Sequence, residues 1–266
     1  MMSKIIIGRY IPSDSIIHRM DPRGKIIATF LFIFVIFLAN NWQSYLIVTF
    51  FTLLSIYFTK LKVKMFWDGV KPLLGLILFT SLLQLFFAPS GKIYWQWWIF
   101  SISTMGTVNA IYIFLRFSLI ILISTVMTLT TMPLEIAAAF EWIMSPLKIF
   151  KVPVAEISLI MSIALRFVPT LFDQTVKIMN AQRARGADFS SGNLIQRIKA
   201  IVPLLVPLFI NSLEVAIDLA TAMESRGYRS SEGRTRYRTL AWSKYDLYNL
   251  GFFMTLTILL MVFRRY

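Results

Sequence analysis

Long runs of apolar residues, separated by short polar segments, are the main pattern along this chain. A helix needs about 20 mostly apolar residues to cross the hydrocarbon core of a bilayer. The candidates for such helices are the runs Ile26–Ala39, Ser44–Thr59, Pro72–Ala88, Thr107–Thr130 and Leu247–Phe263. The first two runs are short, so we expect them to extend past these limits or to form a tight hairpin through Asn40 and Asn41.

Two further apolar segments, Val154–Met179 and Ala200–Ala222, carry polar residues at helical spacing. A hydropathy window alone would assign both segments to the membrane. Their polar residues recur every three or four positions, which places them on one face of each helix. They are Ser158, Ser162, Arg166, Thr170, Gln174 and Lys177 in the first segment, and Asn211, Glu214, Asp218, Thr221 and Ser225 in the second. We therefore expect long amphipathic helices that lie along an interface or pack on each other, with bends at Pro169, Pro203 and Pro207.

Composition and charge place the chain in the membrane and orient it. Hydrophobic residues make up 57% of the sequence, more than a soluble domain of this length needs for its core. The net charge of +14 does not indicate a nucleic-acid partner, because the basic residues flank apolar runs, and lysine and arginine accumulate in cytoplasmic loops. Five lie in Met1–Lys25, four in Lys60–Lys71 and fourteen in Met132–Asp246. Between the third and fourth runs, where the aromatic-rich loop Pro89–Gly106 fits the outer interface, the one basic residue is Lys92.

These patterns predict an all-α integral membrane protein of the cell membrane, with about five transmembrane helices and long amphipathic cytoplasmic helices. We expect residues 1–131 to form a membrane domain of four transmembrane helices. Residues 132–246 then form a cytoplasmic domain, and residues 247–266 a last transmembrane helix. The N-terminus and the basic region should face the cytoplasm. With no cysteine and with His18 as the single histidine, neither disulfides nor a metal site of several imidazoles can form, and we predict no bound metal.

A short element recurs at the end of each amphipathic segment. It reads Ala184-Arg185-Gly186 in the first copy and Ser225-Arg226-Gly227 in the second, and an alanine precedes each copy in the same register, at Ala181 and Ala222. A glycine that ends a helix behind a basic last turn is ordinary capping, and capping explains either copy alone. Two copies in one register and one helical context point further, to two arginines that bind two similar partners.

On these motifs the chain resembles the transmembrane T component of energy-coupling factor transporters, bacterial ATP-driven importers of vitamins and trace metals. Two supporting segments are similar to that family, His18–Lys25 before the first span and Leu165–Pro169 in the first amphipathic segment. The second motif departs from the family pattern by serine in place of alanine at Ser225. The resemblance covers essentially the whole chain.

The resemblance implies a coupling scaffold without catalytic residues. It implies that Arg185 and Arg226 enter grooves on two related ATP-binding cassette ATPase subunits, and that a separate substrate-binding membrane subunit lies against the chain. ATP and Mg²⁺ would then belong to the ATPases, and this chain would bind no cofactor. The sequence agrees, because no Gly-x4-Gly-Lys-Ser/Thr element is present. The transported substrate is expected to be a vitamin or another micronutrient.

Several charged residues have structural explanations as well. Asp21-Pro22-Arg23 is expected to cap the first span. Arg166 is expected to pair with Glu214 and Asp218 on the neighbouring helix, because a buried pair of like charges needs a cation. Arg116, inside the fourth run, is expected to snorkel or to pair.

Two other functions stay open from the residues alone. One is a membrane enzyme acting on anionic lipid or polyprenyl-phosphate headgroups, for which Glu214 and Asp218 would be the starting material. Such an enzyme needs convergent acidic ligands for Mg²⁺, and only this one pair occurs. The other is a secondary transporter, which the near absence of acidic residues from the first four spans disfavours.

Overall fold

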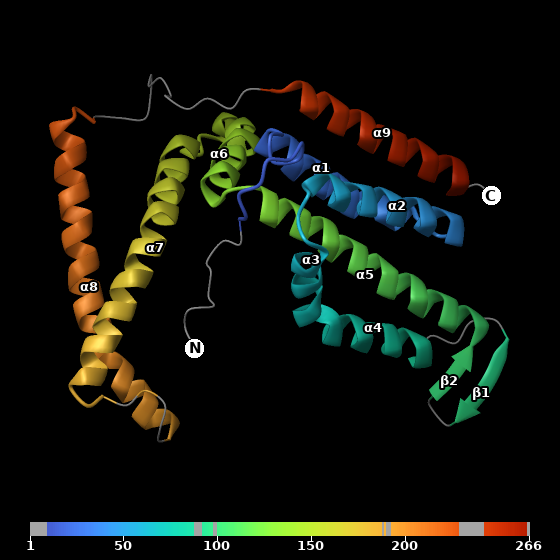
Figure 1. The fold of residues 1–266 in the computed structure, drawn as a ribbon, viewed down its shortest axis with the longest axis horizontal. Coiled ribbons are helices and arrows are strands. Elements are labelled where there is room, and N and C mark those ends of the chain that lie inside the picture. Colours follow the sequence, from blue (N-terminus) through green and yellow to red (C-terminus); the bar gives the residue numbers. More distant parts are fainter. Residues whose placement is uncertain are drawn as a thin grey trace. The chain divides into compact units, whose positions relative to one another are not determined.

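The computed structural model describes residues 10–87, 92–97, 100–187, 189, 193–228 and 242–264. Within them the chain is helical except for one two-stranded hairpin, which confirms the predicted class (Figure 1). The helices are α1 (Pro22–Val35), α2 (Trp42–Thr59), α3 (Val63–Val70), α4 (Leu74–Phe87), α5 (Thr104–Thr130), α6 (Pro133–Met144), α7 (Val154–Ala184), α8 (Leu194–Ser225) and α9 (Lys244–Arg264). The 3-10 turns are η2 (Ile36–Leu38), η3 (Lys71–Leu73) and η4 (Ser145–Phe150), and the strands are β1 (Ile93–Trp97) and β2 (Phe100–Ser103).

The chain divides into two compact units. The first comprises residues 1–142 together with 240–266, and the second comprises residues 143–239. The first unit therefore contains most of α6, and the chain leaves it after Trp142 and returns to it at Leu240. The predicted domain boundaries concern the membrane and stay predictions.

Helices α1, α2, α5 and α9 run side by side in the first unit and enclose its core (Figure 1). Phe32 and Ile36 from the first helical segment meet Val48 of α2, Ile123 of α5 and Leu256 of α9 in this core. The opposite faces of these helices expose large apolar side chains, Phe34 and Tyr57 among them. An apolar exterior on long helices is what contact with lipid requires.

Six helical segments among the described residues are long and apolar enough to cross a membrane. They are Trp42–Thr59, Val63–Phe87, Thr104–Thr130, Val154–Ala184, Ile201–Ser225 and Lys244–Phe263. Length and composition thus include α7 and α8, as the hydropathy window did, and the polar stripe remains the argument for placing these two outside the bilayer. The first predicted span forms α1 and η2, which together are shorter than these six segments.

The predicted loop between the third and fourth spans contains regular structure. Strands β1 and β2 pair antiparallel, with Trp97 opposite Phe100, and Ser103 then caps α5 by accepting a hydrogen bond from the Gly106 N–H at 3.1 Å. Ile93 to Trp97 are β-branched and aromatic residues with one glutamine, the types that pack well in strands. Residue 88 at the end of the third predicted span and residues 89–91, 98 and 99 of that loop lie outside the described residues.

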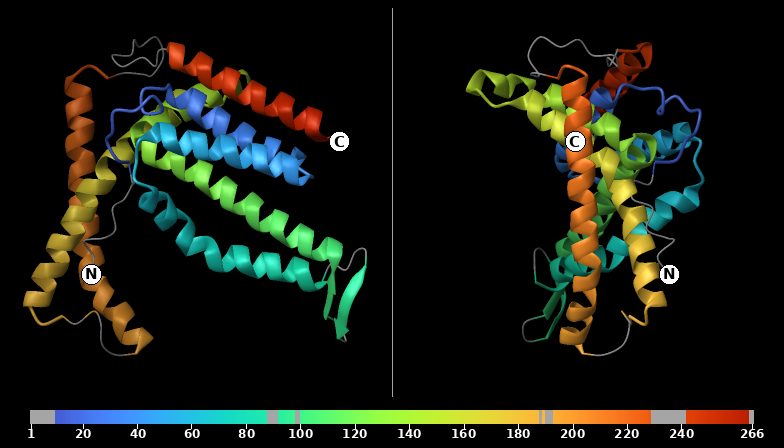
Figure 2. Two further views of the ribbon diagram at one scale, coloured as in Figure 1. Left: turned by 45° about the vertical axis from the view of Figure 1, so that its right-hand side comes forward. Right: turned by 90° about the vertical axis from the view of Figure 1, so that its left-hand side faces the viewer.

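Helices α7 and α8 make up most of the second unit and pack across each other (Figure 2). The same figure shows α8 changing direction in its N-terminal part, where Pro203 and Pro207 interrupt the backbone hydrogen bonds. The polar stripes and the prolines therefore lie on two continuous helices, as the spacing of the polar residues predicts.

Candidate docking site

The first Arg-Gly motif forms the end of α7. Ala184 is the last helical residue, Arg185 is the C-cap, and Gly186 has a φ of 90°, in the left-handed region. The Gly186 N–H donates to the Arg183 carbonyl at 3.0 Å, and the Ala187 N–H donates to the Gln182 carbonyl at 3.0 Å. This pair of hydrogen bonds is the Schellman motif, which satisfies carbonyls that the helix end leaves unpaired.

The second motif repeats this geometry at the end of α8. The Gly227 N–H donates to the Glu224 carbonyl at 2.9 Å, and the Tyr228 N–H donates to the Met223 carbonyl at 3.0 Å. Gly227 has a φ of 74°. Ser225, which stands where the first copy has alanine, donates its hydroxyl hydrogen to the Ala222 carbonyl at 3.0 Å and so stays compatible with the helix. The two motifs are therefore one structural element used twice.

The glycines and the arginines of the motifs have different explanations. A Cβ atom added to Gly186 or Gly227 would meet no atom within 4 Å, so the glycines are needed for their backbone conformation and not for space. The Arg185 and Arg226 side chains are exposed, and within the described part of the chain neither guanidinium has a hydrogen bond or ion pair. Capping accounts for the glycines and leaves both arginines free for a partner.

The two motifs lie at opposite ends of the crossed helices. In Figure 1 the end of α7 lies at the bottom of the pair and the end of α8 at the top. Helix α8 alone has 32 residues. At 1.5 Å per residue it is about 48 Å long, somewhat less with its bend. The arrangement therefore presents two separate arginines, and not one composite site.

The predicted pairing of Arg166 with Glu214 and Asp218 does not form. All three side chains are exposed, and no ion pair joins Arg166 to either carboxylate. Because both carboxylates face solvent, no buried pair of like charges needs a cation.

Asp21 and Arg23 take the capping role that the sequence predicts. Asp21 is the N-cap of α1, its carboxylate accepts a hydrogen bond from the Arg23 N–H at 2.8 Å, and Pro22 occupies the first helical position. The Arg23 Nε atom also lies 3.8 Å from Asp21 Oδ1. Both residues lie at the N-terminal end of α1, which is predicted to face the cytoplasm.

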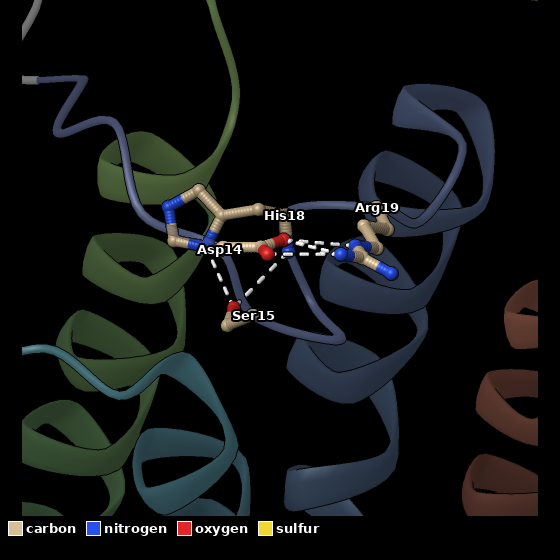
Figure 3. Close-up of polar contacts among 4 residues, drawn as sticks. All are labelled: Asp14, Ser15, His18 and Arg19. Carbon is tan, nitrogen blue, oxygen red and sulfur yellow. Dashed lines mark hydrogen bonds and ion pairs between the residues drawn. The ribbon is translucent and has the colours of Figure 1, made fainter.

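His18 belongs to the segment that precedes α1. Its Nε2 lies 3.0 Å from the Ile11 carbonyl oxygen, and its Nδ1 lies 2.7 Å from Ser15 Oγ. Arg19 makes a two-fold hydrogen bond with Asp14, at 2.8 and 2.9 Å, on the surface beside it (Figure 3). Arg19 therefore pairs with Asp14 on the surface, while His18 holds the segment together through Ile11 and Ser15.

Arg116 pairs without a carboxylate. Its Nη2 donates to the Ala39 carbonyl at 3.3 Å, where η2 ends, and its guanidinium lies 5.0 Å from the centre of the Phe37 ring. A cation at a helix C-terminus and over an aromatic face is stabilised by the helix dipole and the ring quadrupole. This explains a charge within α5 as a structural one.

Sequence reasoning missed Asp246, a buried carboxylate near the start of α9. Its Oδ1 accepts the Asp21 N–H at 2.8 Å and its Oδ2 accepts the Ser243 N–H at 2.7 Å, which ties the beginnings of α1 and α9 together. The sequence contains a capping pattern here, because Ser243 lies three residues before Asp246. The hydrogen bond between Asp246 and Asp21, however, joins residues that are far apart in the chain. The contact between the rings of Trp142 and Trp242 was missed for the same reason, because these two residues are also far apart in the chain.

The described residues offer little to the alternative enzyme. They contain no group of three or more histidine, cysteine or acidic side chains placed to hold a metal ion. Glu214 and Asp218 are exposed on α8, and no third acidic side chain among the described residues joins them in such a group. A magnesium-dependent headgroup enzyme would need such a cluster.

Comparison with known proteins gives one consistent result. Residues 13–237 match the model of a family described as cobalt transport protein. The chain is 69% identical, over all of its length and 96% of the relative, to the energy-coupling factor transporter transmembrane protein of Lactobacillus helveticus. It is 51% identical to the protein of that name from Lacticaseibacillus paracasei, over 99% of this chain and 100% of the relative, and 48% identical to that from Bacillus subtilis, over 92% and 93%.

Proposed function

We infer the function from the premise that this chain belongs to the family of energy-coupling factor transporter transmembrane proteins. It is a multi-pass membrane protein of such a transporter. We propose that it links two cytoplasmic ATPase subunits to a substrate-binding membrane subunit during uptake of a vitamin or another micronutrient. On this proposal ATP and Mg²⁺ bind to the ATPases, and the chain itself carries no catalytic residue.

One observation carries the proposal: the same Arg-Gly cap ends two crossed helices, and both arginines are exposed without a partner among the residues that the structure describes. Two equivalent arginines at separate ends fit two related subunits, one at each end. An arginine forms two parallel hydrogen bonds with a carboxylate, so acidic grooves on the ATPases are the matching surface. The ATPases would then move the two helix ends relative to each other, and α7 and α8 would transmit that motion.

The test is affinity purification of the tagged chain from its native membrane. We expect the wild-type chain to bring with it two ATP-binding proteins and a small hydrophobic membrane protein. Each of Arg185→Ala and Arg226→Ala should weaken retention of one ATPase, and the double variant should lose both. Removal of one arginine from a buried carboxylate pair typically costs about 2 to 5 kcal/mol, which is roughly thirty-fold in affinity or more.

A matched control lies on the same helix. Lys177 is exposed on α7, two turns before the first motif, so Lys177→Ala removes a cation without touching the cap. We expect normal retention of both ATPases in this variant. Arg185→Lys should retain only part of the binding, because an ammonium cannot reproduce the planar fork. Full retention of both ATPases by the double arginine variant would refute the docking role.

A further inference from the structure

The chain leaves the first unit once and returns to it once, and the points of exit and return lie next to each other inside the first unit. Trp142 is the last residue before the chain enters the second unit, and Trp242 follows shortly after its return at Leu240. The two indole rings lie 6.4 Å apart, centre to centre, in an edge-to-face arrangement. Because the chain connects the two units here, any displacement of the second unit is passed along the chain to the membrane helices at Trp142 and Trp242.

Arg23 joins the tryptophan pair to α1. Its guanidinium lies 5.3 Å from the centre of the Trp142 ring, within the range of a cation–π interaction. The Arg23 side chain is only 13% exposed, and its Nε lies 3.8 Å from the Asp21 carboxylate. The guanidinium therefore lies between a buried carboxylate and an aromatic face, which fixes its position more tightly than an exposed ion pair would.

The contacts continue from Arg23 to α9. Asp21 donates its N–H to the Asp246 carboxylate, as described above, and Gly24 packs directly against that carboxylate. A Cβ atom added to Gly24 would lie 3.2 Å from Asp246 Oδ1. The beginnings of α1 and α9 thus approach closely at the point where the tryptophans and Arg23 meet.

We propose that Arg23, Trp142 and Trp242 form a joint that transmits movement of the second unit to α1 and α9. This joint, named here the tryptophan joint, is a set of positioning residues for the coupling of ATP hydrolysis to uptake. The transport readout of the proposal rests on the proposed function. Its structural readout does not.

The transport test uses the complete complex reconstituted into vesicles. We expect Arg23→Gln and Trp142→Leu to retain both ATPases and ATP hydrolysis, while uptake per ATP hydrolysed falls about five-fold or more. The double variant should be no worse than the worse single variant, because both changes break one contact. Arg23→Lys should fall between, because it keeps the charge and loses the planar stack. Arg19→Gln, which removes a neighbouring exposed arginine, is the control and should leave the ratio unchanged.

The structural test uses the chain alone in lipid nanodiscs. Because the chain has no cysteine, spin labels can be attached to Thr128→Cys on α5 and Thr221→Cys on α8, both exposed positions. We expect Arg23→Gln to broaden the measured distance distribution between the two labels, and Arg19→Gln to leave it as in the parent. Trp242→Phe, a milder change, replaces Arg23→Gln if that variant does not accumulate.

The outcomes separate the two proposals. If the wild-type chain brings no ATPases, the proposed function fails, and the label distances still decide whether the joint exists. Unchanged distances in Arg23→Gln and Trp242→Phe would overturn the joint. A parallel loss of hydrolysis and uptake would also overturn it, because that result indicates disrupted assembly and not lost transmission.

Discussion

At the scale of single residues, the two Arg-Gly motifs separate structural from functional requirements. Gly186 and Gly227 both adopt positive φ and contact nothing that a Cβ would strike, so backbone conformation is their whole explanation. Arg185 and Arg226 are not needed for the cap, since its hydrogen bonds come from the backbone. A substitution can therefore damage the cap and keep the arginine, or the reverse.

We expect Gly186→Ala to destabilise the end of α7 while Arg185 is kept. An alanine held in the left-handed conformation costs about 1 to 2 kcal/mol. Faster hydrogen exchange at the amides of Gly186 and Ala187, whose hydrogen bonds form the cap of α7, would report the loss. Gly75→Ala is the control: Gly75 in α4 has equally open surroundings but no positive φ, so alanine there should be neutral or stabilising by about 0.5 to 1 kcal/mol.

His18 gives the N-terminal segment a pH dependence. Burial lowers the pKa of His18 below its usual value of 6.5, with a smaller contribution from the charge of Lys25, while the hydrogen bond to Ile11 and the charge of Asp14 oppose this. The unfolded chain therefore binds the proton more tightly. The stability contributed by neutral His18 is complete above pH 6.5 and is lost as the pH falls through the lowered pKa of the folded state.

Thermal unfolding of the chain in nanodiscs at a series of pH values checks this sign. We expect the unfolding temperature of the wild type to fall more steeply below about pH 6.5 than that of His18→Gln, which can keep the hydrogen bond to Ile11 and does not titrate. Parallel pH profiles for the two proteins would contradict the assignment.

At the scale of elements, the beginnings of α1 and α9 are held together by polar contacts, although the core of their unit is apolar. Asp246 is 3% exposed and both of its carboxylate oxygens accept backbone hydrogen bonds, one of them from Asp21. A buried N–H that loses its acceptor retains its full desolvation cost. The position of α9 therefore depends on one side chain as well as on the packing of its apolar face.

Asp246→Ala should destabilise the chain by about 2 to 3 kcal/mol, because it leaves the N–H groups of Asp21 and Ser243 without their acceptor. Asp246→Asn should be milder, since its amide oxygen can replace one of the two. Denaturant or thermal unfolding in detergent measures the difference. Asp14→Ala, which removes an exposed carboxylate paired with Arg19, should give no measurable change.

Sequence reasoning succeeded for interactions between residues that are close in the chain and failed for interactions between residues that are far apart. The Asp21 cap and both helix ends could be predicted because their hydrogen bonds join residues close in the chain. The pairing of Arg166 with Glu214 and Asp218 failed because spacing along a helix gives its polar face but not the point at which it crosses another helix. Asp246, Trp142 and Trp242 act across long separations that no local pattern specifies. The hairpin of β1 and β2 was missed because its aromatic residues were assigned to the membrane interface, without regard to their preference for strands.

At the scale of the whole molecule, the orientation of α7 and α8 decides whether both arginines can meet ATPases. Both helices are long and apolar enough to cross a membrane, but if each crossed once, the two motifs would finish on opposite sides. The polar stripes favour helices on the cytoplasmic side, where the basic residues gather. Both motifs would then be accessible from one compartment.

Single cysteines introduced into this cysteine-free chain test that orientation. We expect Ala181→Cys and Ala222→Cys, exposed positions near the two motifs, to react with a membrane-impermeant maleimide only after the cells are permeabilised. Thr104→Cys, exposed at the start of α5 beside the hairpin, should react in intact cells and serves as the outside control. Reaction of Ala181→Cys or Ala222→Cys in intact cells would place α7 or α8 across the bilayer.

The continuous course of α8 has a consequence for variation in its length. Each inserted or deleted residue changes the distance between Arg226 and the crossing with α7 by about 1.5 Å and turns the arginine about the helix axis by roughly 100°. A single-residue change therefore aims the guanidinium in a new direction even though the distance hardly alters. Changes of a near-integral number of turns preserve the direction and alter only the reach. Tolerance of insertions in α8 should accordingly be periodic, with a period close to that of the helix itself.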